Sequence, residues 1–203
     1  MTGYYDIQDL KKRLRRTARD VYQIQWNDAL LDEIINEAQR EYALYSGCLT
    51  GRTELVSDGR ESADLPADFI RVLKVFNPEK KEIPIKSFRQ LAREYGDFRK
   101  ISGVVARCAV FDFDGHKKYR IFPVLPAGMK IGTMYYERLP QTNILEVKNI
   151  EAVEAYALYM MFLMTGKDLA NVWYDKFMKL VRKDNSAFYI PGIQHGYRTG
   201  RFY

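Results

Sequence analysis

The sequence is poor in the residues that build metal sites and disulfide frameworks. Its 203 residues include two cysteines, Cys48 and Cys108, and two histidines, His116 and His195. The cysteines lack the spacing of a metal-binding motif, so we expect two buried thiols in a reducing compartment. Neither histidine lies at a ligand-like spacing from a second metal-binding side chain. We therefore predict no metal and no cofactor.

The chain also lacks a long apolar run. A transmembrane helix needs about 20 consecutive apolar residues, and the uncharged stretch from Ala155 to Met164 stops at about half that length. The N-terminus, Met1 to Asp6, has no basic start followed by an apolar stretch, so we expect no secretory signal and no membrane partner. A helix that is apolar all round must be covered by its own domain or by neighbouring copies. The side chains predicted to lie in this buried helix or subunit interface are Tyr156, Tyr159, Met160, Phe162 and Met164.

Common catalytic and phosphate-binding motifs are missing as well. The sequence has no glycine-rich phosphate loop and no Gly-x-Ser-x-Gly elbow. One segment, Val110 to Gly115, resembles the nucleophile motif of haloacid-dehalogenase-like phosphatases. That resemblance implies that Asp112 attacks phosphorus and that Asp114 acts as the general acid, with Mg²⁺ between them.

Two features of the neighbouring sequence argue against a phosphatase. His116 follows the motif where that family has threonine or valine, and Tyr119 to Phe122 form another strand-like segment. The family instead requires a helix and a parallel sheet after the motif. An Asp-Gly hairpin explains the same residues, so the phosphatase is a remote alternative and we predict that the protein is not an enzyme.

The charge of the chain is moderately basic, with a formal net charge of +6 at pH 7. Such a charge favours nucleic acid or acidic partners without specifying either. Basic residues surround the apolar stripe of the first predicted helix, either as phosphate contacts or as a solvated helix face. A DNA-binding module is therefore an alternative function, and it predicts strongly salt-dependent binding to any duplex. The candidate phosphate contacts are Lys11, Lys12, Arg15, Arg16 and Arg19.

Four helices are predicted where apolar residues recur every three or four positions. They span residues 6–21, 27–46, 149–165 and 168–183. Asn27 is a good N-cap for the second helix, and Gly47 is a natural residue to end it. The face of this helix that we expect to be buried comprises Leu31, Ile34, Ile35, Ala38, Tyr42 and Tyr45. The first two helices are predicted to pair antiparallel, and the short turn before Asp168 predicts the same for the last two.

The region between the helix pairs, residues 52–137, consists of strand-like segments with turn residues between them. Asp58-Gly59 predicts a hairpin between its flanking strands. Ser87 and Gln90 form a capping-box pattern that predicts a short helix to about Tyr95. An antiparallel meander is predicted over 104–112, 117–123 and 129–136. The predicted fold is therefore α+β and mainly α, a helical bundle with a small central antiparallel sheet and an extended C-terminal tail.

The last segment, residues 184–203, has neither helical nor strand periodicity. Its glycines and Pro191 oppose a long helix, and its aromatic residues are too many for an inert linker. We predict an arm that becomes ordered in a groove of a partner, and the alternative is a frayed end packed on its own domain 1–183. The side chains predicted to bind through this arm are Phe188, Tyr189, Ile190, Pro191, Tyr197, Arg198, Arg201, Phe202 and Tyr203.

The order of these elements resembles the head-to-tail adaptor (connector) proteins of tailed bacteriophages, particularly those of short-tailed phages. Trp26 to Gln39 is similar to an early helix of that family. Leu65 to Val72 is similar to its first central strands. Tyr119 to Pro123, and then Ile131 to Pro140, are similar to the strands that precede its last helix pair. The segment from Ser87 to Lys100 does not match the family residue by residue.

The resemblance implies a structural protein of the virion, at the head–tail junction, that is made in the cytoplasm of a bacterial host. Such proteins form a ring, commonly of twelve copies, beneath the portal, which they bind through a C-terminal extension. They give a tail or nozzle protein its attachment surface, and double-stranded DNA passes through the lumen. A channel that gripped phosphates tightly would act as a brake, so we expect the lumen to be less basic than the whole chain.

Overall fold

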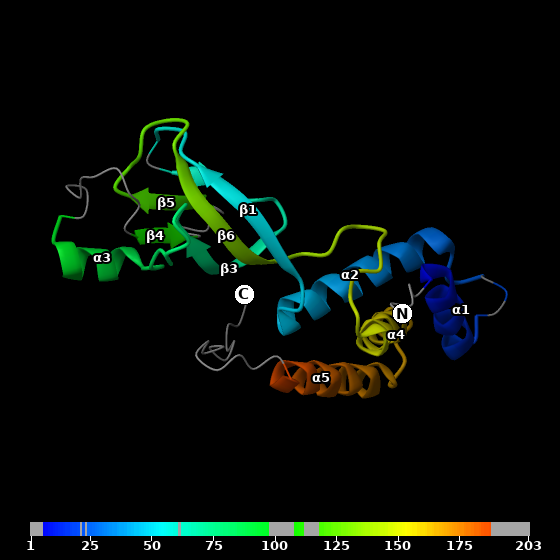
Figure 1. The fold of residues 1–203 in the computed structure, drawn as a ribbon. Coiled ribbons are helices and arrows are strands. Elements are labelled where there is room, and N and C mark those ends of the chain that lie inside the picture. Colours follow the sequence, from blue (N-terminus) through cyan, green and yellow to red (C-terminus); the bar gives the residue numbers. More distant parts are fainter. Residues whose placement is uncertain are drawn as a thin grey trace. The chain divides into compact units, whose positions relative to one another are not determined.

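The computed structural model describes residues 6–20, 22, 24–60, 62–97, 108–111 and 118–187. The chain divides into two compact units. The helical unit comprises Met1–Ser46 and Thr142–Tyr203, and the sheet unit comprises Gly47–Gln141. The helices and strands of both units confirm the predicted α+β class, with helix slightly predominant (Figure 1).

The described helices of the helical unit are α1 (Ile7–Ala18), α2 (Asp28–Ser46), α4 (Ile150–Met164) and α5 (Ala170–Ala187). Helix α4 packs against each of the other three, and α2 also packs against α5. The core of this bundle forms around the buried side of α4, which comprises Ile150, Ala152, Val153, Ala155, Ala157, Leu158, Met161 and Phe162. Small alanine side chains on that side let the neighbouring helices approach α4 closely. The predicted bundle of N-terminal and C-terminal helices is thus present.

Side-chain caps explain where α1 and α2 begin. Asp6 accepts a hydrogen bond from the backbone N–H of Gln8 at 2.9 Å, immediately before α1. Asn27 accepts one from the backbone N–H of Leu30 at 2.9 Å, immediately before α2. Such caps satisfy N–H groups of the first helical turn that have no partner within the helix. Because the caps are local, these two starts were predictable from the sequence.

Two helices differ from the prediction by more than one residue at a boundary. Helix α1 ends at Ala18 rather than at residue 21, because Arg19 adopts a left-handed conformation with φ of 62°. Helix α5 spans Ala170–Ala187 rather than 168–183, so its last turn lies in the segment assigned to the arm. The sequence contains no glycine or proline between Lys183 and Pro191. Nothing in it therefore ends the helix at Lys183.

The strands of the sheet unit form two three-stranded antiparallel sheets. The first has the order β1 (Thr50–Val56), β6 (Lys130–Arg138), β3 (Phe69–Phe76), and the second has the order β2 (Ala63–Asp64), β5 (Lys118–Phe122), β4 (Cys108–Phe111). One apolar cluster draws side chains from both sheets, among them Leu55, Val75, Ala109, Ile121 and Met134. The single predicted sheet is therefore two small sheets that share a core.

The predicted strand pairing is wrong at two places. The strands on either side of Asp58-Gly59 do not form a hairpin, because β1 pairs with β6 while β2 pairs with β5. The predicted meander is right for β4 and β5, but β6 then leaves that sheet and lies between β1 and β3. The segment between β5 and β6, residues 123–129, is longer than a tight hairpin turn. It therefore does not force those two strands to pair.

The short helix predicted within this region is confirmed as α3 (Phe88–Tyr95). The Ser87 Oγ accepts a hydrogen bond from the backbone N–H of Gln90 at 3.2 Å, and the Gln90 Oε1 accepts one from the backbone N–H of Ser87 at 2.7 Å. This reciprocal pair is the capping box that the sequence predicted.

Candidate assembly surfaces

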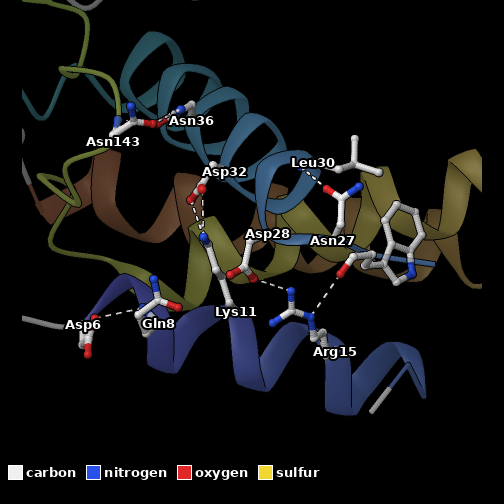
Figure 2. Close-up of polar contacts among 11 residues, drawn as sticks. Asp6, Gln8, Lys11, Arg15, Asn27, Asp28, Leu30, Asp32, Asn36 and Asn143 are labelled. Atoms are coloured by element: carbon white, nitrogen blue, oxygen red, sulfur yellow. Dashed lines mark hydrogen bonds and ion pairs between the residues drawn. The ribbon is translucent and has the colours of Figure 1, made fainter. Parts of the chain in front are cut away.

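Two of the predicted phosphate contacts lie between helices α1 and α2. The Lys11 Nζ is 2.7 Å from the Asp32 Oδ1, and the Lys11 residue is 2% exposed. The Arg15 guanidinium pairs with Asp28 and donates from its Nε to the carbonyl oxygen of Trp26 at 3.1 Å (Figure 2). The two pairs occur in opposite sequence order on the two helices, so α1 and α2 are antiparallel, as predicted. Because Lys11 and Arg15 are buried and bonded to carboxylates, they are poor candidates for phosphate contacts.

The carboxylates of this region are held in their charged form. The hydrogen bond from Arg15 lowers the pKa of Asp28, against the opposing effect of burial, and the charge of Lys11 lowers it further. Burial alone would raise the pKa of Asp20, but hydrogen bonds from the N–H groups of Trp26, Gln25 and Ile24, together with the Arg15 charge, give it a net decrease. The charged pairs therefore stabilise the α1–α2 pair at neutral pH.

The other predicted phosphate contacts lie along α1 and at its C-terminal end. Lys12 and Arg16 lie four residues apart on the helix, and Arg19 is its C-cap. All three are exposed, and we call them the basic stripe. The Lys12 Nζ lies 3.4 Å from an oxygen of Asp9. In the part of the chain that the structure describes, neither Arg16 nor Arg19 has an ion-pair partner. Phosphate binding by the basic stripe stays a prediction.

The loop after the basic stripe is held by one carboxylate. Asp20, which is 8% exposed, accepts backbone hydrogen bonds from Ile24 at 3.0 Å, from Gln25 at 3.2 Å and from Trp26 at 2.8 Å. The side chains of Tyr22 and Ile24 nevertheless point outward and are 87% and 86% exposed. Ile24 is thus an exposed apolar side chain on an anchored backbone, and Tyr22 is exposed close to it in the sequence.

The apolar helix predicted as a buried helix or subunit interface is mostly covered by its own unit. Tyr156 contacts Phe177 with ring centroids 4.9 Å apart, and Tyr159 contacts Tyr174 at 5.0 Å. The earlier tyrosine of α4 contacts the later residue of α5, so α4 and α5 are antiparallel, as predicted. Of the remaining predicted residues, Phe162 is buried, Met160 is partly buried and Met164 is exposed. A subunit contact by this helix stays a prediction, and it concerns mainly its exposed C-terminal end.

Helix α2 carries an acidic stripe that the sequence analysis did not identify. Glu33, Glu37 and Glu41 recur every four residues, which places them on one face of the helix. Burial of the Glu41 carboxyl raises its pKa, and the nearby charge of Glu37 raises it further. Tyr45 follows four residues later and is 40% exposed, although it was predicted to be buried with Tyr42. The available signal was the four-residue spacing of the glutamates, none of which belongs to the predicted buried face of α2.

Several predicted residues lie outside the described part of the chain. They are the arm residues from Phe188 to Tyr203, the two histidines, and the aspartates Asp112 and Asp114 of the phosphatase-like motif. Among the described residues, no helix is long and apolar enough to cross a membrane, and no three metal-binding side chains are grouped to hold an ion. Val110 lies in β4, which pairs antiparallel with β5, so the motif does not open the parallel sheet that a phosphatase requires.

The comparison with known families identifies the chain. A family model described as SU10 adaptor protein matches residues 5–189. The chain belongs to the SU10 adaptor protein family. No curated protein matches it. The match covers the described elements of both units, from α1 to the end of α5.

Membership in the SU10 adaptor family confirms the resemblance to phage head-to-tail adaptors. It assigns this SU10 adaptor a structural role between the head and the tail of a phage, which favours the non-enzymatic interpretation. The family match ends at residue 189, so most of the predicted arm follows it.

Proposed function

We propose that this SU10 adaptor forms a closed ring, commonly of twelve copies, beneath the portal of a phage head. The ring connects the portal to a tail or nozzle protein and lets double-stranded DNA pass through its lumen. The observation that supports this most strongly is the family match over residues 5–189, which spans the helical unit and the sheet unit together. The adaptor is made in the cytoplasm of its bacterial host and acts at the head–tail junction of the virion.

We propose that the segment that follows α5 binds the portal. Helix α5 ends at Ala187, and the next residues, from Phe188 to Tyr203, combine aromatic side chains with Arg198 and Arg201. Aromatic and arginine side chains are the residues that most often dominate binding energy in protein interfaces. A segment that orders on binding uses such anchors to offset the loss of conformational entropy.

Sedimentation of the adaptor with the portal ring of the same phage tests this function. The full-length chain is compared with a chain stopped after Ala187, which leaves α5 intact, and with a chain in which residues 188–203 are replaced by a glycine–serine segment of equal length. We expect the full-length chain to sediment with the portal at near-equal stoichiometry and both variants to stay in the supernatant. Failure of the full-length chain to bind the portal would contradict the proposed function.

A DNA-binding role is the second candidate, and the exposed basic stripe favours it. Three phosphate contacts per chain predict a slope of about −3 in a plot of log affinity against log salt concentration. The phosphatase proposal has no such support, because β4 and β5 are antiparallel. Filter binding of a random duplex at several salt concentrations measures the slope. Duplex binding by the free chain that disappears when the chain is bound to the portal would place the basic stripe at a protein interface instead.

A further inference from the structure

Helix α2 carries acidic residues on two opposite sides. On one side, Asp28 and Asp32 pair with Arg15 and Lys11 of α1. The acidic stripe lies on the other side, since Glu37 follows Asp28 by about two and a half helical turns. Helix α1 therefore occupies one side of α2 and leaves the acidic stripe on the other.

In the described part of the chain, the acidic stripe has one nearby cation, Arg40 of the same helix. Glu37 pairs with Arg40 at 3.7 Å and at the protein surface. Within the described ranges, neither Glu33 nor Glu41 makes an ion pair or a side-chain hydrogen bond. The charges of Glu41 and Glu37 also oppose ionisation of Tyr156, whose pKa is raised first by burial and then by these two glutamates. The stripe is thus a local excess of negative charge in a chain with a net charge of +6.

Aromatic rings extend the acidic stripe towards α4 and α5. Tyr45 ends the stripe and contacts Phe177 with ring centroids 6.0 Å apart. Tyr156 and Tyr174 contact the same phenylalanine at 4.9 Å and 6.3 Å. Glu41 is therefore a half-buried carboxylate next to tyrosine rings, and although the nearby charge of Arg40 favours its ionised form, no ion pair to it is present among the described residues. A lysine or arginine of another chain that binds next to Glu41 contacts both a carboxylate and the faces of aromatic rings.

The basic stripe of α1 has the complementary order of side chains. Lys12, Arg16 and Arg19 are followed by the exposed side chains of Tyr22 and Ile24. The acidic stripe covers about 12 Å of helix, whereas Lys12 and Arg16 cover about 6 Å and Arg19 follows at the end of α1. Each stripe thus consists of three charges followed by an exposed aromatic side chain.

The two stripes cannot meet within one chain. Helix α1 packs on α4, and its Arg13 pairs with Glu154 of that helix at 3.4 Å. Tyr156 and Tyr159 of α4 instead contact α5, and Figure 1 shows α4 between α1 and α5. The basic stripe and the acidic stripe therefore lie on different sides of the helical unit.

We propose that the basic stripe of one copy docks on the acidic stripe of the next copy, with Tyr22 and Ile24 against Tyr45. This inference rests on the proposed ring, and it names the surfaces that close it. Two different surfaces joined head to tail generate a ring when the rotation closes. Within one chain, two cations four residues apart on α1 already pair with two carboxylates four residues apart on α2, as Lys11–Asp32 and Arg15–Asp28 show. This docking also places the basic stripe in the contact between neighbouring copies, away from the DNA channel.

Charge reversal tests the pairing. The basic-reversed variant is Arg16→Glu with Arg19→Glu, the acidic-reversed variant is Glu33→Arg with Glu37→Arg, and the swapped variant combines all four changes. Loading onto the portal ring is measured by sedimentation velocity as a function of adaptor concentration. We expect each reversed variant to need at least tenfold more protein for half-maximal loading. The swapped variant, and an equimolar mixture of the two reversed variants, are expected to load like the unmodified chain.

The controls change the same charge elsewhere on the helical unit. Lys179→Glu with Arg182→Glu and Asp168→Arg with Asp175→Arg alter exposed residues of α5 and of the turn before it, and they should load normally. Circular dichroism establishes that each variant is folded. The inference is overturned if the reversed variants load normally, if the swap and the mixture fail to restore loading, or if only the basic-reversed variant is affected. An unmodified chain that does not bind the portal contradicts the proposed function instead.

Discussion

The side chain of Gln39 accepts a hydrogen bond, through its Oε1, from the backbone N–H of Glu146 at 3.0 Å. Its Nε2 donates to the carbonyl oxygen of Ile144 at 3.0 Å, and the whole residue is buried, with 0% exposure. One turn earlier on α2, Asn36 makes two hydrogen bonds with Asn143, at 3.1 Å and 2.9 Å (Figure 2). Two amides of α2 thus hold the segment that leads into α4.

Replacing Gln39 with leucine keeps a similar volume but removes these hydrogen bonds, together with a third from the backbone N–H of Val147 to the Gln39 Oε1 at 3.5 Å. The backbone N–H of Glu146 and the carbonyl of Ile144 then lose their partner in a buried or half-buried place. We expect the free energy of unfolding to fall by about 2–4 kcal/mol. Urea denaturation measures this loss, and Gln8→Leu, at an exposed position of α1, is expected to change it by less than about 0.5 kcal/mol. Equal stability of the two variants would show that Gln39 does not hold the segment.

Gly132 allows β6 to pass β3 at very close range. A Cβ at this position would lie 1.9 Å from the carbonyl oxygen of Phe76, and the residue has φ of 155°. Gly132→Ala should therefore destabilise the sheet unit by more than about 3 kcal/mol, since the clash involves backbone on both strands. Gly128→Ala is the control, because φ is 81° there but no atom lies within 4 Å of the added Cβ. The control should cost about 1 kcal/mol in thermal unfolding.

The sequence was most informative where structure is decided locally. Helix starts depend on caps such as Asp6 and Asn27, and the short helix α3 depends on a capping box, so these elements were predicted correctly. The sheets were only half predicted, because the partner of β6 is decided by residues far away in the chain. Strand pairing follows from packing on both faces, and turn residues such as Asp58-Gly59 do not reveal it.

Helix α1 shows that a pattern of charges in the sequence does not tell which cations are buried. Lys11 and Lys12 are adjacent in the sequence, yet one is 2% exposed and paired with Asp32 while the other is fully at the surface. The signal was present, since Lys11 follows Ile7 by one helical turn and so borders the apolar stripe. Position relative to the apolar stripe therefore distinguishes the buried Lys11 from the exposed Lys12.

The two lysines give a direct test of this difference. Lys11→Met leaves the Asp32 carboxylate, whose side chain is 34% exposed, without its cation, so we expect unfolding free energy to fall by about 1–3 kcal/mol. Lys12→Met should leave stability unchanged within about 0.5 kcal/mol, but it should weaken any salt-dependent duplex binding by the free chain. Guanidinium denaturation and filter binding are measured for both variants. Weaker duplex binding by a fully stable Lys11→Met variant would mean that Lys11 contacts phosphate after all.

The lowered pKa of Asp20 predicts that the folded protein loses stability in acid. Its pKa in the folded protein is lowered from the ordinary value of 3.8. A lowered pKa means that its contribution is fully present above about pH 4 and is lost as the pH falls through the folded value. The reason is that a protonated carboxyl accepts the N–H groups of Ile24, Gln25 and Trp26 less strongly. Asp20→Asn should therefore be less stable than the unmodified chain at pH 7, and the difference should shrink steadily towards pH 2. Thermal unfolding followed by circular dichroism across this range measures both chains, and a difference that is independent of pH would show that the Asp20 charge does not hold the loop.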